Sequence, residues 1–396
     1  MQDNRNAAKE GPLFSVIVLC YKNTELTGGM LESILAQDYP RIELIVSDDG
    51  TPDFDCAKVE ADIRRRMDAL QNAHIERLCV RKNEANMKTV RHVESVLPMA
   101  TGEYVVFTAA DDRFADSGVL SRYVRCFEAH PQHKWLVGKV AITSEDYKTT
   151  HHILPAEKDV PYFMADDAQR LFGRWSRRGM AIPCCMAFRP EAFVLAGGID
   201  TSYSLMEDWP LVLHLLLAGY APAYIDELTA LHSVGGVTNS NNRYGVEIRR
   251  MFYMDKYRLL DTITEKNLHL LSPEDKRCYR LYQREIMDRN YFLNIDLPTK
   301  SKPALLAEGI LHPRKGFWLL EIVFRRVEGR IRPRLLLVLA AILAAGALVS
   351  GFAGGNGFAT AALSLGACGF AALAVFCAAY RRFLNRLDAA RRELVN

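Results

Sequence analysis

Short apolar runs alternate with segments of helical periodicity along the first 115 residues. The apolar runs are rich in β-branched and aromatic residues, which is typical of buried strands. We expect strands at residues 14–20, 42–46, 75–80 and 104–107, with helices at 26–37, 55–70 and 87–99. Strict alternation with short connections predicts an α/β fold with a doubly wound, mostly parallel sheet flanked by helices.

Polar side chains follow each of these predicted strands: Tyr21 and Lys22, Asp48 and Asp49, Arg81 to Asn83, Asp111 and Asp112. The ligand crevice of an open α/β sheet lies beyond the carboxyl ends of its strands. Adjacent carboxylates at Asp111 and Asp112 offer hard oxygen ligands for Mg²⁺ or Mn²⁺, and such an ion neutralises a diphosphate. An Asp-rich turn without a ligand is the alternative interpretation.

The charge is unevenly distributed along the 396 residues, whose formal net charge is +3. Lys and Arg are concentrated in residues 313–334 and 381–396, so residues 1–312 are net acidic and carry no footprint for nucleic acid. Nine cysteines without CxxC spacing indicate reduced thiols, and the adjacent Cys184 and Cys185 are interpreted as packing residues. The polar tail, residues 1–12, has no apolar segment of a signal peptide.

Four blocks occur in order: SVIVLCYKN, SILAQDYPRIELIVSDDGT, TGEYVVFTAADD and GGIDTSYSLMEDW. Together they resemble the family 2 glycosyltransferases, which have the GT-A fold. The resemblance implies a catalytic domain at 13–240, with a nucleotide-binding half at 13–115 and an acceptor half at 116–240. It also implies a nucleotide-sugar donor, with a UDP-sugar favoured, and transfer that inverts the anomeric configuration without a covalent intermediate.

The resemblance assigns roles at the donor side. The backbone from Leu19 to Tyr21 would cradle the base, and Asp49 would accept a hydrogen bond from the base edge. Asp111 matches the last carboxylate of the DxD motif, which holds a divalent cation (Mg²⁺ or Mn²⁺) on the diphosphate, with Asp112 as its usual neighbour. The chain departs from the motif at Ala109, where the first aspartate normally stands, and this leaves metal dependence open.

Three further side chains are candidates for phosphate or metal contacts. Lys88 and Arg91 lie on the predicted helix before the motif strand and share a face at three residues' spacing, with a solvated basic face as the alternative. His232 lies in a segment resembling the family's loop that closes over the site. We interpret it as a ligand of the metal or diphosphate, with an ordinary loop histidine as the alternative.

The acceptor side is expected around Glu207, Asp208 and Trp209, at the start of an apolar helix whose first turn contains Pro210. As structure, Asp208 would cap this helix. The resemblance instead implies that Asp208, in preference to Glu207, takes the proton from the acceptor hydroxyl. The helix dipole favours an ionised carboxylate here, which predicts a weak base.

Arg174, Arg177 and Arg178, together with Trp209, are candidate acceptor-binding residues. Three arginines suit a phosphate or a lipid diphosphate. A solvent-facing basic loop is the alternative interpretation.

The C-terminal part is expected to differ in kind. Residues 241–312 predict a helical extension, residues 313–334 a basic interfacial segment, and residues 335–380 a pair of uncharged apolar helices joined by a Gly-rich link. Arginines on both outer flanks, including the tail 381–396, predict an inner (plasma) membrane hairpin with the catalytic domain and both termini cytoplasmic. Two Ala-rich helices buried in a soluble domain are the alternative.

The sequence therefore predicts a membrane-anchored inverting glycosyltransferase acting on a lipid-linked acceptor or a growing surface polysaccharide, near membrane lipid. The alternative is a membrane-tethered nucleotide-sugar-binding protein without transferase activity, which Ala109 favours. A sugar nucleotidyltransferase would need a Gly-rich loop after the first strand, and the residues after Cys20 provide none.

Overall fold

The computed structural model describes residues 11–22, 29–70, 74–234, 245–280 and 287–312, with positions 315, 318 and 319. The chain divides into two compact units, residues 1–287 and residues 288–396. The predicted hairpin at 335–380, the basic tail and almost all of the predicted interfacial segment lie outside the described residues. Among the described helices, none is long and apolar enough to cross a bilayer.

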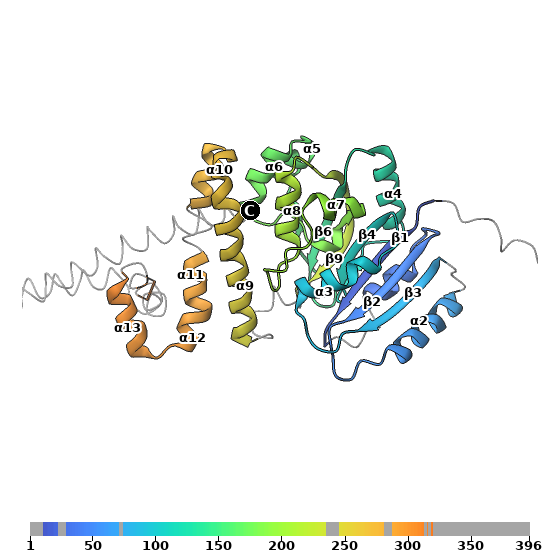
Figure 1. Ribbon diagram of the computed structural model, residues 1–396, viewed down its shortest axis with the longest axis horizontal. Helices are drawn as coiled ribbons and strands as arrows, with labels where there is room; N and C mark the ends of the chain where they lie inside the picture. Colours follow the sequence, from blue (N-terminus) through green and yellow to red (C-terminus); the bar gives the residue numbers. More distant parts are fainter. Residues whose placement is uncertain are drawn as a thin grey trace, which may run out of the picture. The chain divides into compact units, whose positions relative to one another are not determined.

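The described residues of the first unit form a nine-stranded sheet. Its strands are β1 Phe14–Cys20, β2 Ile42–Asp48, β3 Ile75–Lys82, β4 Tyr104–Ala109, β5 Asp112–Phe114, β6 Trp135–Thr143, β7 Thr150–Leu154, β8 Met186–Phe188 and β9 Ala223–Ser233. The strand order is β3-β2-β1-β4-β8-β6-β9-β5, and β7 pairs with the C-terminal part of β6. Figure 1 shows β1 to β4 side by side in this sheet.

The prediction of parallel pairing is confirmed for β1 to β4. β1 pairs in parallel with both β2 and β4, and β2 pairs in parallel with β3. Beyond β4 the sheet is mixed: β6 pairs in parallel with β9, whereas β8 pairs antiparallel with both β4 and β6, and β5 pairs antiparallel with β9. Chain geometry explains the change: β6 and β7 are joined by a short hairpin connection, which is compatible with antiparallel pairing alone.

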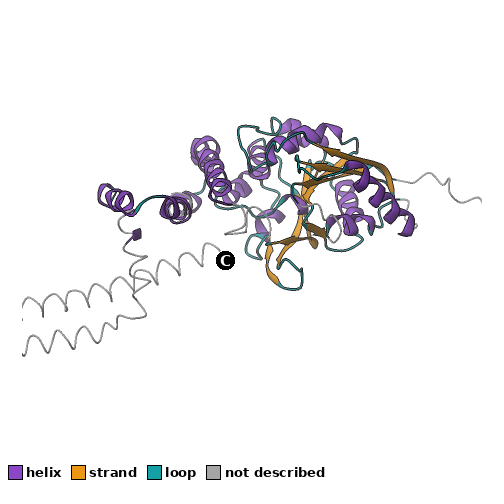
Figure 2. Cartoon of the chain, turned by 90° about the horizontal axis from the view of Figure 1, so that it is seen from below, coloured by secondary structure: helices purple, strands orange, loops and turns teal. Residues whose placement is uncertain are grey.

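Helices cover both faces of this sheet (Figures 1 and 2). The helices of the first unit up to β9 are α1 Met30–Leu35, α2 Cys56–Leu70, α3 Thr89–Val96, η1 Leu97–Met99, α4 Val119–Ala129, α5 Val160–Met164, α6 Ala168–Trp175, η2 Pro183–Cys185, α7 Pro190–Leu195 and α8 Asp208–Leu217. The first predicted helix, 26–37, is described from Met30, directly after Gly29, and residues 23–28 lie outside the described residues.

Alternate side chains of β1 enter two separate hydrophobic clusters. Phe14, Val16 and Val18 pack with side chains of α1, α2 and α4 on one face. Ile17 packs with side chains of α3, α6 and α8 on the other face. Burial on both faces explains why this strand is a continuous apolar run instead of an alternating one, and it confirms the doubly wound arrangement.

The region predicted as a helical extension is helical where it is described. It contains α9 Gly245–Leu259, η3 Leu260–Thr264, η4 Glu265–Leu270, α10 Pro273–Cys278, α11 Met287–Tyr291, η6 Phe292–Asp296, α12 Leu297–Thr299 and α13 Lys302–Leu311. The boundary between the compact units, after Met287, falls inside this region. Within the second unit, Lys300 and Lys315 both form ion pairs with Asp296 and Glu308.

Candidate functional site

The site is built where β1, β2 and β4 end. The backbone N–H of Asp49 donates to Cys20 O (2.8 Å), and that of Ala110 donates to Leu19 O (3.1 Å). The charges of Asp48 and Asp111 both act on the Cys20 thiol, whose pKa is raised first by burial and then by these carboxylates. Polar residues that follow β2 and β4 therefore lie on either side of the end of β1, as the parallel arrangement predicts.

The Asp49 carboxylate is already engaged by the chain. It is 3% exposed and accepts hydrogen bonds from Asn83 Nδ2 (2.9 Å), Met87 N (2.9 Å) and Lys88 N (3.0 Å). These contacts fix the loop between β3 and α3. The same loop lines a pocket of about 420 Å³ formed by Arg81, Lys82, Asn83, Glu84, Ala85 and Met87. Asp49 thus shapes this pocket, and its predicted contact with a base edge stays a prediction.

Lys88 and Arg91 do not share a helix face, and that part of the prediction is wrong. Lys88 is the N-cap of α3 and has a positive φ of 70°, because the loop held by Asp49 turns sharply before the helix begins. Arg91 lies in the first turn of α3 and is exposed. A phosphate contact by either side chain stays a prediction.

The turn after β2 is stabilised by Asp48. Its carboxylate accepts Thr51 N (2.6 Å) and Thr51 Oγ1 (2.7 Å), and Thr51 Oγ1 accepts the backbone N–H of Lys22 (2.8 Å). Gly50, in the middle of this turn, has φ 79°, and a Cβ there would lie 2.6 Å from the carbonyl carbon of Ala85. The turn therefore ties the loops after β1, β2 and β3 together.

Gly50→Ala is expected to lower the free energy of unfolding by about 1–3 kcal/mol, since the new side chain combines a left-handed φ with a backbone clash. Urea denaturation measures this loss. Gly179→Ala is the matched control, because a Cβ at Gly179 meets nothing within 4 Å. Equal stability of the two variants would contradict the packing of the Gly50 turn against the β3–α3 loop.

Asp112 is held by contacts from two strands. Its Oδ2 accepts hydrogen bonds from Thr108 Oγ1 (3.1 Å) and Ala109 N (3.2 Å), and its Oδ1 lies 2.7 Å from His232 Nδ1. The antiparallel register of β5 and β9 places Asp112 directly opposite His232. Asp111, the preceding residue, is half-buried, and its pKa is raised by burial and then by the charge of Asp112.

The donor set here fits a divalent cation. Asp112, Cys184 and His232 bring their ligand atoms within 4.8 Å of one another. Mg²⁺ and Mn²⁺ prefer carboxylate oxygens to the soft sulfur of a thiol, so Cys184 is the least suitable of the three for these ions. A carboxylate on Nδ1, as Asp112 is on His232, is common among metal-ligating histidines. Metal binding by Asp111, Asp112 and His232 stays a prediction.

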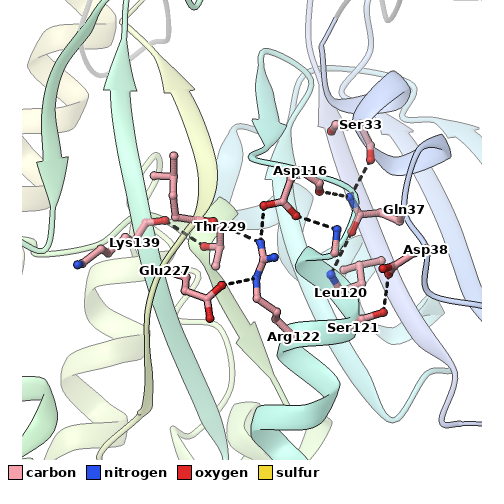
Figure 3. Close-up of polar contacts among 12 residues, drawn as sticks. Ser33, Gln37, Asp38, Asp116, Leu120, Ser121, Arg122, Lys139, Glu227 and Thr229 are labelled. Carbon is pink, nitrogen blue, oxygen red and sulfur yellow. Dashed lines mark hydrogen bonds and ion pairs between the residues drawn. The ribbon is translucent and has the colours of Figure 1, made fainter.

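A polar network anchors β5 between α1 and β9 (Figure 3). The backbone N–H of Phe114 donates to Ser33 Oγ (3.0 Å), and Gln37 Nε2 donates to the carbonyl oxygen of Asp116 (2.7 Å). Arg122 forms ion pairs with the Asp116 carboxylate (2.9 Å) and with the carboxylate of Glu227 on β9 (3.4 Å). These contacts hold β5 in place, and with it the position of Asp111 and Asp112 at its start.

Glu207 and Asp208 lie at the start of α8. Glu207 is the N-cap residue, and Asp208 is the first helical residue. Glu207 forms no side-chain capping hydrogen bond to this helix end, whereas the Asp208 carboxylate interacts with the backbone N–H groups of Trp209 and of Asp208 itself, so the capping interpretation of Asp208 stays open. Burial raises the pKa of both, that of Glu207 well above its ordinary value with a further contribution from Asp208. The prediction of a weak base is wrong, because burial outweighs the N–H groups of the helix end.

The short helix η2 links the two groups of carboxylates. It packs against β4, β5, β6, β8 and β9. The pKa of Cys185 in η2 is raised to about 12 by burial, and the charges of Asp112 and Asp208 both add to this rise. Asp112 and Asp208 thus act on one thiol from separate elements of the fold. That β5 and the start of α8 form one site stays a prediction.

The three arginines proposed for the acceptor are engaged in ion pairs. Arg174 and Arg178 bind opposite oxygens of the Asp159 carboxylate, at 2.6 and 2.5 Å, and Asp159 is fully buried. Arg177 pairs with Asp275 at 2.5 Å. The alternative of a solvent-facing basic loop is wrong, because these guanidinium groups form ion pairs with the buried carboxylates of Asp159 and Asp275. Acceptor binding by them stays a prediction.

Trp209 packs its ring at the edge of the hydrophobic cluster on the α8 side of the sheet. The Lys256 ammonium lies 6.0 Å from the centroid of this ring and 4.6 Å from that of Phe252. An aromatic surface beside the Asp208 backbone is compatible with a sugar acceptor. The role of Trp209 in acceptor binding stays a prediction.

Two residues near the site were not predicted from the sequence. Cys184 is not part of a metal-ligand spacing pattern in the sequence, and only the fold brings it close to Asp112 and His232. Tyr147, in the β6–β7 turn, donates its hydroxyl to the carbonyl oxygen of Asp111 (2.5 Å), and the Arg113 guanidinium lies 4.2 Å from its ring centroid. No local pattern marks Tyr147, because its contact depends on the long-range position of the hairpin.

Comparisons with known proteins agree with this construction. The sequence model of the family described as "Glycosyltransferase like family 2" matches residues 11–251. The uncharacterized protein MT1568 of Mycobacterium tuberculosis (strain CDC 1551 / Oshkosh) is 27% identical over 218 residues, which cover 54% of this chain and 64% of that protein. The uncharacterized protein y4gI of Sinorhizobium fredii (strain NBRC 101917 / NGR234) is 31% identical over 141 residues, 35% of this chain and 14% of that protein. The matches therefore span less than two thirds of either relative.

Two solved structures were also matched, each at low sequence identity. S. aureus TarS residues 1–349 with UDP-GlcNAc has a TM-score of 0.48 at 16% identity, covering 93% of this chain and 92% of TarS. The mannosyltransferase PcManGT from Pyrobaculum calidifontis, with GDP-Man and Mn²⁺, has a TM-score of 0.44 at 18% identity, covering 93% of this chain and 87% of PcManGT.

Proposed function

Because the chain belongs to the glycosyltransferase like family 2, we propose that it transfers a sugar from a nucleotide-sugar donor to a hydroxyl acceptor with inversion. The observation that carries the proposal is the family match over residues 11–251, which contains both the carboxylates after β4 and the Glu207–Asp208 pair. The proposal takes Asp112 as a donor-side carboxylate and Asp208 as the base of one site. Direct displacement needs these two groups on opposite sides of the reacting sugar.

On the donor side, the pocket beside Asp49 would receive the nucleotide, with a uridine base favoured by the sequence resemblance. Asp111, Asp112 and His232 would hold a divalent cation, which supplies positive charge to the departing nucleoside diphosphate. The pairing of Asp112 with both β4 and β9 keeps these ligands in place before the donor arrives.

On the acceptor side, Asp208 would take the proton from the attacking hydroxyl. Burial raises the pKa of both Glu207 and Asp208, so the two carboxylates titrate as a pair. A carboxylate with a raised pKa is a stronger base than an exposed aspartate.

The acceptor and the location of the enzyme are proposed from the sequence alone. A lipid-linked or surface glycan acceptor follows from the expected membrane hairpin at 335–380, with the catalytic domain in the cytosol. Cell fractionation of the full chain against a variant ending at residue 334 would check this anchoring.

The donor proposal is tested by thermal shift with UDP-GlcNAc, UDP-glucose and GDP-mannose, each with and without Mn²⁺. A donor at 100 times its dissociation constant adds about 2.7 kcal/mol, which raises Tm by about 5–10 °C. We expect such a rise with one nucleotide only and a larger rise with Mn²⁺. Release of nucleoside diphosphate by the same sample supports transfer, whereas binding without release supports the alternative, a tethered nucleotide-sugar-binding protein.

A further inference from the structure

Helix α9 begins inside the family match, which ends at residue 251, and extends past it, so Asp255 lies outside the match. The Asp255 side chain contacts the segment that leads into Glu207 and Asp208. The Asp255 carboxylate is 4% exposed. Its oxygens accept Ser204 N at 2.9 and 3.1 Å and Leu205 N at 2.7 Å. A buried carboxylate that binds consecutive backbone N–H groups fixes the path of the chain at that point.

We propose that Asp255 is a positioning residue for the Glu207–Asp208 pair, acting through the backbone of residues 204–205. The inference rests on the proposed function, since it concerns the orientation of the candidate base. Asp255 does not touch the reacting atoms. It determines where α8 begins and hence where the Asp208 carboxylate points.

The same segment is held from other directions. The carbonyl oxygen of Ser204 accepts the backbone N–H of Val90 at the start of α3 (3.3 Å). The hydroxyl groups of Tyr203 and Thr262 lie 3.1 Å apart, and Thr262 belongs to η3, directly after α9. Residues 203–205 are therefore held by three contacts, from Val90, Thr262 and Asp255, and Asp255 supplies the largest number of hydrogen bonds among them.

Helix α9 also reaches the far side of the pair. Lys256, next to Asp255, lies over the ring of Trp209, which follows Asp208. Burial lowers the pKa of Lys256 to about 8. Two successive residues of α9 thus contact the chain immediately before and immediately after the two carboxylates, and a shift of α9 would move both ends of this turn.

The charge of Asp255 reaches the pair as well. The pKa of Glu207 is raised by burial, then by Asp208, and then by Asp255. The groups that face Asp255 are Glu207, Tyr203 on the supporting turn and Arg258 on its own helix. Burial raises the pKa of Asp255, and the backbone N–H groups of residues 204–206 and the charge of Arg258 oppose this rise. Removing the charge of Asp255 is therefore expected to lower the apparent pKa values of the carboxylate pair as a unit.

The experiment uses the full-length chain with UDP-GlcNAc and GDP-mannose, with Mn²⁺, and measures nucleoside diphosphate release against pH. Asp255→Asn is expected to lower kcat by about 10–100-fold, as misplacement of a reacting group does, with the donor-induced rise in Tm unchanged. Its acid limb is expected to move to lower pH. Asp255→Glu keeps the charge and lengthens the side chain, so it is expected to lower kcat without moving the acid limb.

Asp261→Asn is the matched control, since it makes the same chemical change at an exposed position of η3. It is expected to leave both kcat and the pH profile unchanged. Hydrogen exchange at the amides of Ser204 and Leu205 provides a readout that does not need turnover, and we expect at least tenfold faster exchange in Asp255→Asn than in the control.

The outcomes separate the two proposals. If the unmodified chain releases no nucleoside diphosphate, the proposed function fails, and with it the catalytic meaning of Asp255. If the unmodified chain turns over and both Asp255 variants match it in kcat, positioning by Asp255 is overturned while the function stands. Unchanged amide exchange in Asp255→Asn would overturn the backbone contact itself.

Discussion

Asp208→Asn is expected to lower kcat about 10³-fold, because general-base catalysis contributes about 10²–10⁴-fold and the amide cannot take the acceptor proton. The change is nearly isosteric and removes a carboxylate whose pKa is already raised by burial. Donor binding should survive, since the groups around Asp49 and Asp112 are untouched. The test therefore measures kcat and, in parallel, the rise in Tm caused by the donor.

Two comparisons sharpen this result. Asp200→Asn makes the same change at an exposed carboxylate before α8 and is expected to retain full activity. Glu207→Gln leaves the proposed base Asp208 in place, so its loss of kcat should be much smaller than that of Asp208→Asn. If Glu207→Gln were the more damaging variant, the base would be Glu207, and the assignment within the pair would be reversed.

The pH dependence follows from the same burial. A carboxylate base with a raised pKa must lose its proton before it can act, so activity should fall on the acid side at a pH above the usual value for aspartate, 3.8. The pKa values of Glu207 and Asp208 are both raised, so we assign this acid-side fall in activity to the pair. In Asp208→Asn the residual turnover should lack it. An identical acid limb in the variant would assign the titration to another group.

The sequence predicts the donor half of the fold closely because both faces of its sheet are buried. Strands β1, β2 and β4 are mainly apolar and almost fully buried, whereas most side chains of β3 are half-buried or exposed; the predicted starts of all four agree with the structure. Parallel pairing then places the strand ends at one edge, so Asp49 and Asp111 could be expected together. Local pattern was sufficient there, because local burial decided the structure.

The acceptor half depends on pairings that no local pattern encodes. Asp112 meets His232 through the register of β5 and β9, across 120 positions of sequence. The same long-range packing brings Cys184 to this pair and Asp255 to the turn before α8. The identity of these residues was visible in the sequence. Their partners were not, because those partners come from other elements of the fold.

The arginines of α6 and of the turn after it are a second case in which the sequence showed the residues but not their partner. A cluster of three cations was interpreted either as an acceptor site or as a solvated loop, and neither interpretation anticipated Asp159. Asp159 lies nine residues before the start of α6, yet its carboxylate is buried between Arg174 and Arg178. Burial of the anion decides the arrangement, because a buried carboxylate requires charged partners.

Asp159→Ala is expected to lower the free energy of unfolding by about 3–5 kcal/mol, the usual cost of removing one partner from a buried ion pair. The side chains of Arg174 and Arg178 are only 12% and 17% exposed, so both would keep a largely desolvated charge without its counter-ion. Urea denaturation measures the loss. Glu157→Ala removes an exposed carboxylate two residues earlier and should stay within about 0.5 kcal/mol of the unmodified chain.

This prediction also decides what the two arginines do. If they serve mainly to bind an acceptor phosphate, Asp159→Ala should leave stability nearly unchanged and strengthen binding of inorganic pyrophosphate, because their competing carboxylate is gone. If they hold the segment before α6 to the helix, stability falls and pyrophosphate binds no better. The 2.5–2.6 Å contacts to opposite oxygens of one buried carboxylate favour the second result. Acceptor recognition would then fall to groups nearer Asp208, with Trp209 as the first to test.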